Sequence, residues 1–311
     1  MPKQATLAFL IVIRRLRHRT LSSMGRISRT FELAGSSWRV LKADKELVLL
    51  PVLSLIATVA VAVSFLWPIV SSCTDTVGPK NACELGGTDY VIMAVAYIAL
   101  AFITIFFNAA LVHAANERME GGDPTVGSAI RGAVGKVHRI LPWAIVSATV
   151  SVVLRSIEER AGMVGRIVIG LIGLAWSLVA FLVIPVLVIE NIGVIDAVKR
   201  SGTLFKRTWG ENVTAQVGFG FLGLLAALPS IAIIALGFNA GGATAVVAIA
   251  VGVGWLLLAS LVLATLNGIF QTALYRFASG LDTGAFDGNL NAAFGPKRRG
   301  SLGSAPRGFA G

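Results

Sequence analysis

Six long apolar runs that contain no Asp, Glu, Lys or Arg constrain the fold of this chain most strongly. A helix needs about 20 apolar residues to cross the roughly 30 Å hydrocarbon core of a bilayer. With 55% hydrophobic and 14% charged residues, the chain also falls well below the roughly 25% charge that is usual for soluble domains. The sequence therefore predicts an all-α, polytopic membrane helix bundle whose six transmembrane segments are residues 47–70, 90–113, 141–154, 167–189, 215–238 and 243–270.

The basic residues predict how the bundle lies in the membrane. If both termini are cytoplasmic, all but four of the 27 Lys and Arg residues fall in segments on that side, as the positive-inside rule requires. The third run, residues 141–154, is short for a span, so it borrows turns from its flanks, lies in a thinned region or re-enters the membrane. The distribution favours a third run that crosses, because otherwise the four basic residues between positions 199 and 207 would face outward.

Three segments, before the first, third and fifth runs, repeat one pattern of apolar residues at steps of three and four, with basic residues on other faces. This pattern predicts three cytoplasmic amphipathic helices that lie in the membrane interface, each followed by two spans. The apolar positions are Ile27, Phe31, Ala34, Trp38 and Leu41 in the first segment, Val126, Ile130, Ala133, Val137 and Ile140 in the second, and Ile195, Val198, Gly202, Phe205 and Trp209 in the third.

The basic side chains of these helices are the candidate anion-binding residues. Two interpretations stay open, because the same pattern suits both. Either the apolar stripes only orient the spans, or the three helices form a basic collar for anionic lipid or a phosphate-bearing ligand. The candidates are Arg39, Lys42, Arg131, Lys136, Lys199, Arg200, Lys206 and Arg207.

Pro185 and Glu190 mark the junction between the fourth run and the third amphipathic helix, so we interpret them as a hinge. The dipole at the C-terminal end of a helix disfavours an anion, and a solitary exposed carboxylate is therefore not expected there. We expect Glu190 to pair with Arg200 or Lys199, or to accept backbone N–H groups at the start of the next helix.

Three amide side chains in or directly after the apolar runs are candidates for lining a solute path. They are Asn108 in the second run, and Asn267 and Gln271, which are four residues apart on one helix face of the sixth run and the residues after it. They either make hydrogen bonds between helices or line a cavity that opens to the cytoplasm. The runs carry no ionisable Asp, Glu, Lys or Arg, which disfavours proton-coupled transport. A carrier or channel for a small or lipid-like solute is the alternative function.

Enzymatic chemistry is not expected. The histidines His18, His113 and His138 lack metal-ligand spacing, and neither a serine nucleophile elbow nor a phosphate-cradling glycine loop is present. The basic residues punctuate apolar runs instead of gathering on a soluble domain, which argues against nucleic acid. We therefore expect a non-enzymatic protein with no cofactor and no metal, whose partners are membrane lipids, anionic ones included, and other membrane proteins.

The remaining segments give three further expectations. Cys73 and Cys83 lie in the first external loop, where a disulfide would close an 11-residue ring in an oxidising compartment; free thiols are the alternative. Residues 1–23 form a basic leader that is either a surface-lying helix or not translated, with translation beginning at Met24. Residues 24–280 form the membrane domain, and residues 281–311 form a Gly- and Ala-rich, basic cytoplasmic tail that is largely disordered.

Two motifs, FELAGSSWRVLKADKELVLLPVLS at residues 31–54 and PVLVIENIGVIDAVKRSGTLFKRTWGEN at residues 185–212, resemble an uncharacterised family of six-helix bacterial and archaeal membrane proteins, a domain of unknown function. The resemblance extends from about Met24 to about Gly280, and Val194 departs from it where the family has proline. A looser similarity links residues 185–201 to the membrane domain of some glycerophosphoryl diester phosphodiesterases. The resemblance implies this fold and a place in the bacterial inner membrane, and it implies no activity.

Overall fold

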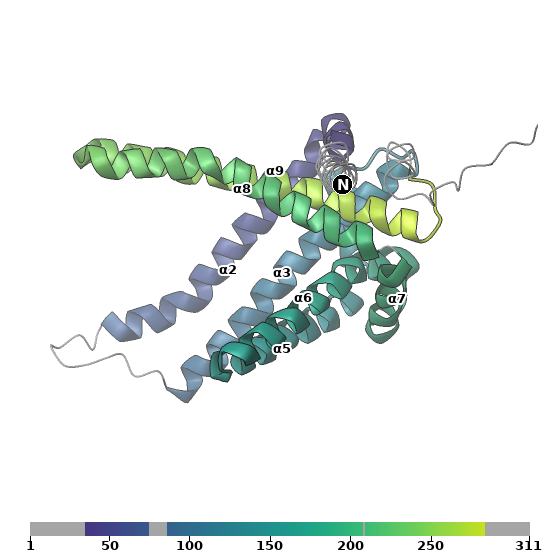
Figure 1. Cartoon of the computed structure of the whole chain (residues 1–311), viewed down its shortest axis with the longest axis horizontal. Coiled ribbons are helices and arrows are strands. Elements are labelled where there is room, and N and C mark those ends of the chain that lie inside the picture. Colours follow the sequence, from purple (N-terminus) through teal and green to yellow (C-terminus); the bar gives the residue numbers. More distant parts are fainter. Residues whose placement is uncertain (1–34, 75–85, 208, 284–311) are drawn as a thin grey trace, which may run out of the picture.

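The computed structural model describes residues 35–74, 86–207 and 209–283, and the side chains within them except those of residues 71–74, 207, 209–219 and 240. Every regular element in these residues is a helix, as predicted. A helix at residues 35–43 comes first. It is followed by η1 (Lys45–Val48), α2 (Leu49–Thr74), α3 (Gly87–Met119), α4 (Val126–Val134), α5 (Val137–Arg160), α6 (Met163–Pro185), the π-helical turn η2 (Val186–Glu190), α7 (Val194–Arg207), α8 (Trp209–Ala240) and α9 (Gly242–Ala278) (Figure 1).

Six segments of the described chain are long and apolar enough to cross a membrane, so the chain is a multi-pass membrane protein. They correspond one to one to the six predicted runs. Five of them extend beyond their runs at one end or both without losing residues, whereas the fifth begins five residues later than its run and ends one residue beyond it. The segments are Lys45–Val70, Gly87–Met119, Val137–Arg160, Met163–Glu190, Gly220–Asn239 and Gly242–Ala278.

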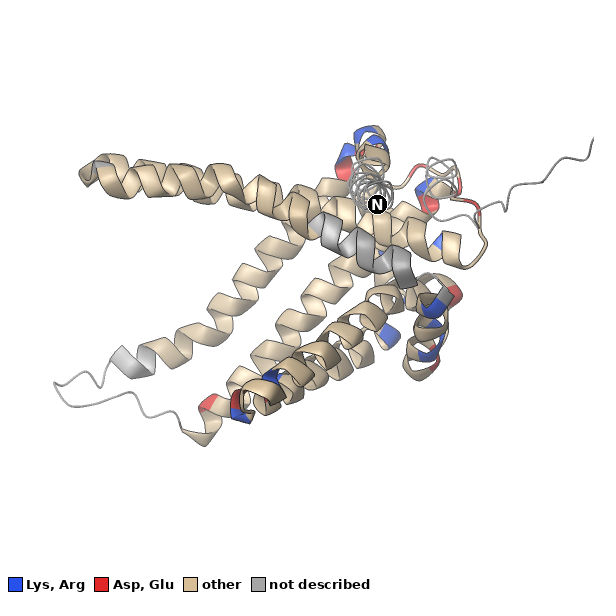
Figure 2. Ribbon diagram, viewed as in Figure 1, with Lys and Arg blue, Asp and Glu red and all other residues tan. Residues whose placement is uncertain are grey.

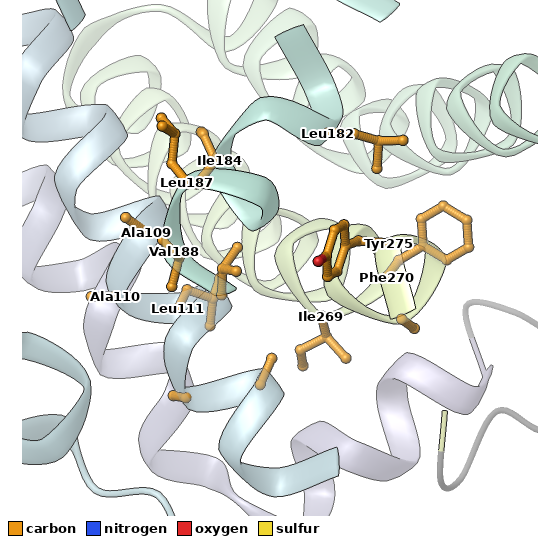
Figure 3. Packing of buried hydrophobic residues seen from close by; sticks show 14 of the residues in the cluster. Ala109, Ala110, Leu111, Leu182, Ile184, Leu187, Val188, Ile269, Phe270 and Tyr275 are labelled. Carbon is orange, nitrogen blue, oxygen red and sulfur yellow. The ribbon is translucent and has the colours of Figure 1, made fainter. Parts of the chain in front are cut away.

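The helices pack together at one end of the molecule and separate toward the other (Figure 1). One hydrophobic cluster joins residues 40–50, the C-terminal part of α3, the α6–η2–α7 junction and residues 266–275 of α9, and Figure 3 shows part of it. We call this region the packed end. The halves of the spans away from it expose large apolar side chains, among them Val63, Leu171, Leu236 and Val247.

Helices α8 and α9 form a hairpin that lies side by side over most of its length (Figure 1). Gly241 and Gly242 make its turn with φ of 66° and 56°, a backbone region that glycine adopts without strain. Close approach continues down the hairpin, because a Cβ on Gly252 would lie 2.6 Å from Ile234 Cγ1. Small residues thus let the two helix backbones approach each other.

The third span is longer than its apolar run. The predicted second amphipathic helix was expected to continue to Ile140, but α4 ends at Val134 and α5 begins at Val137. α5 has 24 residues, so the run of residues 141–154 does borrow turns from both flanks. The break at Gly135 and Lys136 lets the α4 segment turn away while its continuation enters the span.

The buried face of α7 differs from the predicted stripe. Ile195, expected on the apolar side, is 72% exposed, whereas Ala197, Ser201 and Leu204 are fully buried. The Ser201 hydroxyl donates a 2.5 Å hydrogen bond to the carbonyl of Val179 in α6. Small side chains and this bond turn the helix so that its face at 197, 201 and 204 meets α6. The apolar spacing alone did not reveal a serine at the contact.

Several predictions fall outside the described residues and stay predictions. They concern the leader at 1–23, the first part of the first amphipathic helix, the tail beyond residue 283, Cys83, and the side chains of Cys73, Arg207 and Trp209.

Candidate functional site

Glu190 lies at the centre of the junction between the fourth span and α7. Its Oε1 accepts a 2.8 Å hydrogen bond from Arg200 Nε in α7 and a 2.9 Å hydrogen bond from the Tyr275 hydroxyl in α9. The Glu190 side chain is 22% exposed and that of Arg200 is 37% exposed. The predicted partner of Glu190 is therefore present, and a second donor arrives from a helix 85 residues later in the chain.

Pro185 explains a second hydrogen bond near this junction, which joins Gln271 of α9 to the backbone of α6. Proline has no backbone N–H, so the carbonyl four residues earlier, that of Phe181, loses its intrahelical donor. Gln271 Nε2 donates to this carbonyl. Gln271 is 3% exposed, and it supplies from α9 the hydrogen bond that Pro185 removes from α6.

The chain then leaves the span through two unusual backbone features. Residues Val186–Glu190 form a single π-helical turn directly after Pro185, and π-turns of this kind commonly mark functional positions. Asn191 follows with φ of 60° and ψ of 35°, which ends the helix in the left-handed conformation. Pro185 and Glu190 thus bracket the turn where the span gives way to α7, and their role as a hinge stays a prediction.

The C-terminal turn of α3 holds a second polar centre, which sequence reasoning missed. Arg276 of α9 is 5% exposed, and its Nη1 donates to Asn116 Oδ1 at 2.6 Å and to Glu120 Oε1 at 2.9 Å. Its Nε donates to the backbone oxygen of Asp282 at 2.6 Å. A single buried guanidinium therefore joins α3, α9 and the segment that follows α9.

Arg118, in the same turn of α3, reaches the start of the first span. Its Nε lies 2.8 Å from Asp44 Oδ2, and its Nη1 lies 3.3 Å from Asp123 Oδ1. Asp44 is 7% exposed. Burial raises the pKa of the Asp44 carboxyl, since loss of solvent disfavours its charged form and the nearby Arg118 charge offsets this only in part.

A third polar centre joins the α4–α5 turn to Asn191. Lys136 Nζ and Arg139 Nη1 both donate to the single oxygen Asn191 Oδ1. Burial lowers the pKa of the Lys136 ammonium, and the neighbouring charge of Arg139 lowers it further. Lys136 was among the predicted anion-binding residues, whereas Arg139 and Asn191 were not.

The charged residues of the described chain gather toward the ends of the bundle, with long stretches of uncharged helix between them (Figure 2). At the packed end, Arg39 Nη2 donates to Ser36 Oγ at 3.1 Å, and Lys42 Nζ lies 6.0 Å from the centre of the Trp38 ring. Arg39 and Lys42 are both exposed. They are available to a ligand outside the protein.

The predicted basic residues of α4 and α7 divide into two groups. Arg131 and Lys206 are exposed, and Lys199, 75% exposed, lies 4.0 Å from Asp196. Arg200 differs, because its guanidinium is turned toward Glu190. The structure therefore assigns Arg200 to the junction and leaves the first three on the surface.

The three predicted lining amides do not share one cavity. Asn108 and Asn267 line a hollow of about 180 Å³ between α2, α3 and α9, together with Ser54 and Thr104. Gln271 is not among the residues that line this hollow and instead donates to the Phe181 carbonyl, which is the hydrogen bond between helices that the sequence left open as the alternative. Successive positions four apart on a helix drift by about 40°, which turns Gln271 from the α2 side toward α6.

A larger hollow, about 620 Å³, lies between α5 and α6 at the end away from the packed end. Arg155, Glu158, Glu159 and Arg166 line it, and Arg155 Nε lies 3.3 Å from Glu159 Oε1. Among the described residues, no three His, Cys, Asp or Glu side chains come close enough to hold a metal ion.

The sequence contained two signs of the missed residues. The charged stretch Asn116–Glu120 follows the second apolar run directly, and Arg276 stands alone near the end of the sixth. A charge that enters the membrane with its helix is costly unless it is paired, so Arg276, if the sixth helix continues beyond its apolar run, needs a partner that the sequence does not identify.

One family model matches the chain over residues 87–285, and its description is "Family of unknown function (DUF6159)". The matched part contains all of α3 to α9, and therefore Glu190, Tyr275, Gln271 and the Asn191 centre. No curated protein and no solved structure matches the chain.

Proposed function

We propose that this chain, which belongs to the DUF6159 family of unknown function, is a non-enzymatic membrane protein with an organising or accessory role. In this role it engages anionic lipid or partner helices through the basic amphipathic helices of its packed end. The family model carries no activity, so the proposal rests on the arrangement of the chain's own residues.

One observation supports it above the others. The helix at residues 35–43, α4 and α7 all bury one side in the same hydrophobic cluster, through Leu41, Ala133 and Leu204 among others. They leave basic side chains exposed outside the cluster, namely Arg39, Lys42, Arg131, Lys199 and Lys206. Basic side chains beside the ends of membrane spans attract anionic lipid, by on the order of 1 kcal/mol for each residue near the surface.

The placement in the cell is part of the same proposal. We propose that the protein lies in the inner membrane of a bacterium with both termini and the packed end on the cytoplasmic side. The excess of Lys and Arg in the segments joined to the packed end supports this orientation. Cytoplasmic leaflets are also rich in anionic lipid, so the exposed basic side chains would face their expected ligand.

Native mass spectrometry of protein released from nanodiscs of mixed phosphatidylglycerol and phosphatidylcholine tests this function. The triple variant Arg39→Gln, Lys42→Gln, Lys199→Gln is expected to retain less phosphatidylglycerol than the wild type. The matched control, Arg155→Gln, Arg160→Gln, Arg166→Gln, removes the same charge at the other end of the bundle and is expected to retain as much as the wild type. Equal retention in the wild type and the packed-end variant would contradict the proposal.

A carrier or channel for a small or lipid-like solute is the second candidate, and the hollow lined by Asn108 and Asn267 favours it. Its test is access of water to this hollow. In a background with Cys73→Ser and Cys83→Ser, the variant Asn267→Cys should react with a water-soluble thiol reagent, whereas Leu258→Cys on an exposed apolar face should not. An unreactive Asn267→Cys would eliminate this candidate.

A further inference from the structure

Lys136, Arg139 and Asn191 form a charge arrangement that the fold does not neutralise. Lys136 precedes α5 and Arg139 lies in its first turn, while Asn191 ends η2 more than 50 residues later. Both cationic groups donate to the same carboxamide oxygen. Two positive charges thus meet at one neutral acceptor.

No ion pair within the described part of the chain includes Lys136 or Arg139. The carboxylate next to Asn191 in sequence, Glu190, already accepts hydrogen bonds from Arg200 and Tyr275. The lowered pKa of Lys136 has burial and Arg139 as its causes, and no carboxylate is among them. The pair therefore lies in a local field that a bound anion would relieve.

Asn191 is held in place by its backbone. Among the described residues it is the non-glycine residue with a positive φ, 60°, a conformation in which Asn is enriched. The paired Glu190 fixes the position directly before it. A carboxamide offers an oxygen on one side and an NH₂ group on the other, so a rotation of this side chain by about 180° would replace the acceptor with a donor.

We propose that Lys136, Arg139 and Asn191 form a binding site for one phosphate group. The ammonium, the guanidinium and the rotated Asn191 amide together offer donors of the kind that phosphate oxygens accept. Lys136 and Arg139 are half-buried and Asn191 is exposed, so the site is open to a ligand from outside the protein.

The position of the site indicates where the phosphate comes from. The site lies where the third candidate span begins, at Val137, and where the fourth ends, at Glu190. Phospholipid phosphates lie at this level, at the border between the apolar core and water. The lipid form of this inference rests on the proposed function, because it makes this site one of the places where anionic lipid binds; a free phosphate or soluble phosphate ester has the same chemistry.

Two variants test the site. Lys136→Gln with Arg139→Gln removes both cations, and its matched control, Arg131→Gln with Lys199→Gln, removes two exposed cations at the same end. In native mass spectrometry from mixed nanodiscs, the first variant is expected to lower the preference for phosphatidylglycerol over phosphatidylcholine about tenfold. The control removes two surface cations of the proposed lipid-binding face and is expected to lower this preference less. In lipid-free detergent solution, inorganic phosphate is expected to raise the unfolding temperature of the wild type and of the control if the ligand is soluble phosphate.

A third variant, Asn191→Asp, tests the proposed phosphate site even if the Lys136→Gln/Arg139→Gln variant does not fold. Asp tolerates the left-handed conformation and would place a carboxylate between the two cations. It is expected to raise the unfolding temperature and to lose the phosphatidylglycerol preference or the phosphate response, because the site then carries its own anion.

The outcomes separate the two proposals. A larger loss of the lipid preference in the Lys136/Arg139 variant than in the control supports a lipid site, and loss of the phosphate response without such a difference supports a soluble ligand. Equal loss in the control variant would leave the proposed lipid function standing and overturn this site. A Lys136/Arg139 variant with unchanged lipid preference and unchanged phosphate response would overturn the site as well.

Discussion

The hydroxyl of Tyr275 donates a 2.9 Å hydrogen bond to Glu190 Oε1, the atom that also accepts from Arg200. The contact ties the last span to the end of the fourth across 85 positions of sequence. Tyr275→Phe removes the hydroxyl and keeps the ring, so we expect a loss of about 1 kcal/mol in the free energy of unfolding. Thermal unfolding in detergent measures it. Tyr90→Phe, at an exposed tyrosine, is the control and should leave the unfolding temperature unchanged; an equal effect at both positions would contradict the role of Tyr275.

Gln271 and Pro185 should be energetically coupled. Gln271→Leu leaves the Phe181 carbonyl without a donor and is expected to cost about 1 kcal/mol, within the range measured for hydrogen bonds between membrane helices. Pro185→Ala restores a backbone N–H that can bond to the same carbonyl. The loss caused by Gln271→Leu should therefore be smaller in the Pro185→Ala background, as a double-mutant cycle of unfolding free energies would show. Additive effects would exclude this compensation.

Gly268 allows α9 to approach α3. A Cβ at this position would lie 2.4 Å from Leu111 Cδ2 and 3.0 Å from its Cγ, and Leu111 is only 3% exposed, so its side chain would have to shift within the packed cluster. Gly268→Ala is expected to destabilise the protein by about 1 to 3 kcal/mol through overpacking. Gly254→Ala in the same helix meets no atom within 4 Å and should cost nothing. Leu111→Ala should lessen the effect of Gly268→Ala, and a loss that stays the same would point to another cause.

Arg276 is expected to be among the most sensitive charged residues. Arg276→Met leaves Asn116 and the Asp282 carbonyl without their buried donor, and we expect a loss of about 2 kcal/mol. Arg276→Lys should recover only part of it, because an ammonium cannot reproduce the planar, forked geometry of the guanidinium. Unfolding temperatures of the three proteins test this order. Full recovery by lysine would show that charge alone is required.

Asp44 gives a pH dependence with a defined sign. Its pKa in the folded protein is raised above the ordinary value of 3.8, so the folded state holds this proton to higher pH than the unfolded state. Its contribution to stability is present below 3.8 and is lost as pH rises through the folded pKa. Asp44→Asn has no such proton. The unfolding temperature of the wild type should fall relative to that of Asp44→Asn as pH rises through this range, and a relative gain would contradict it.

The spans could be predicted because their cause is local. A run of about 20 apolar residues is favourable in lipid whatever surrounds it, so all six runs correspond to candidate spans. The pairing of Glu190 with Arg200 followed from an equally local argument, the unfavourable dipole at a helix end. The length of the third span was harder to predict. The apolar pattern of α4 continues into the first turn of α5, so it does not reveal that the helix breaks at Gly135 and Lys136.

The remaining features depend on contacts between distant segments. The partner of the Gln271 amide is a backbone carbonyl 90 residues earlier. No side-chain pattern reveals such a partner, so the sequence could not decide between a hydrogen bond and a cavity lining for Gln271. The buried face of α7 follows from the bond of Ser201 to Val179, and the meeting of Lys136 and Arg139 at Asn191 follows from the π-helical turn that places Asn191 there. Such contacts are set by how the helices pack, and helix periodicity alone does not contain them.

The contacts of α9 also set an order for biosynthesis. Gly268, Gln271, Tyr275 and Arg276 meet α3, α6 and η2, yet they are translated after all of these elements. While the ribosome makes the first five spans, the Phe181 carbonyl has no glutamine donor and Asn116 has no arginine. The first five spans must therefore remain in the membrane without these contacts. The packed end can form completely only after the last helix has left the insertion machinery.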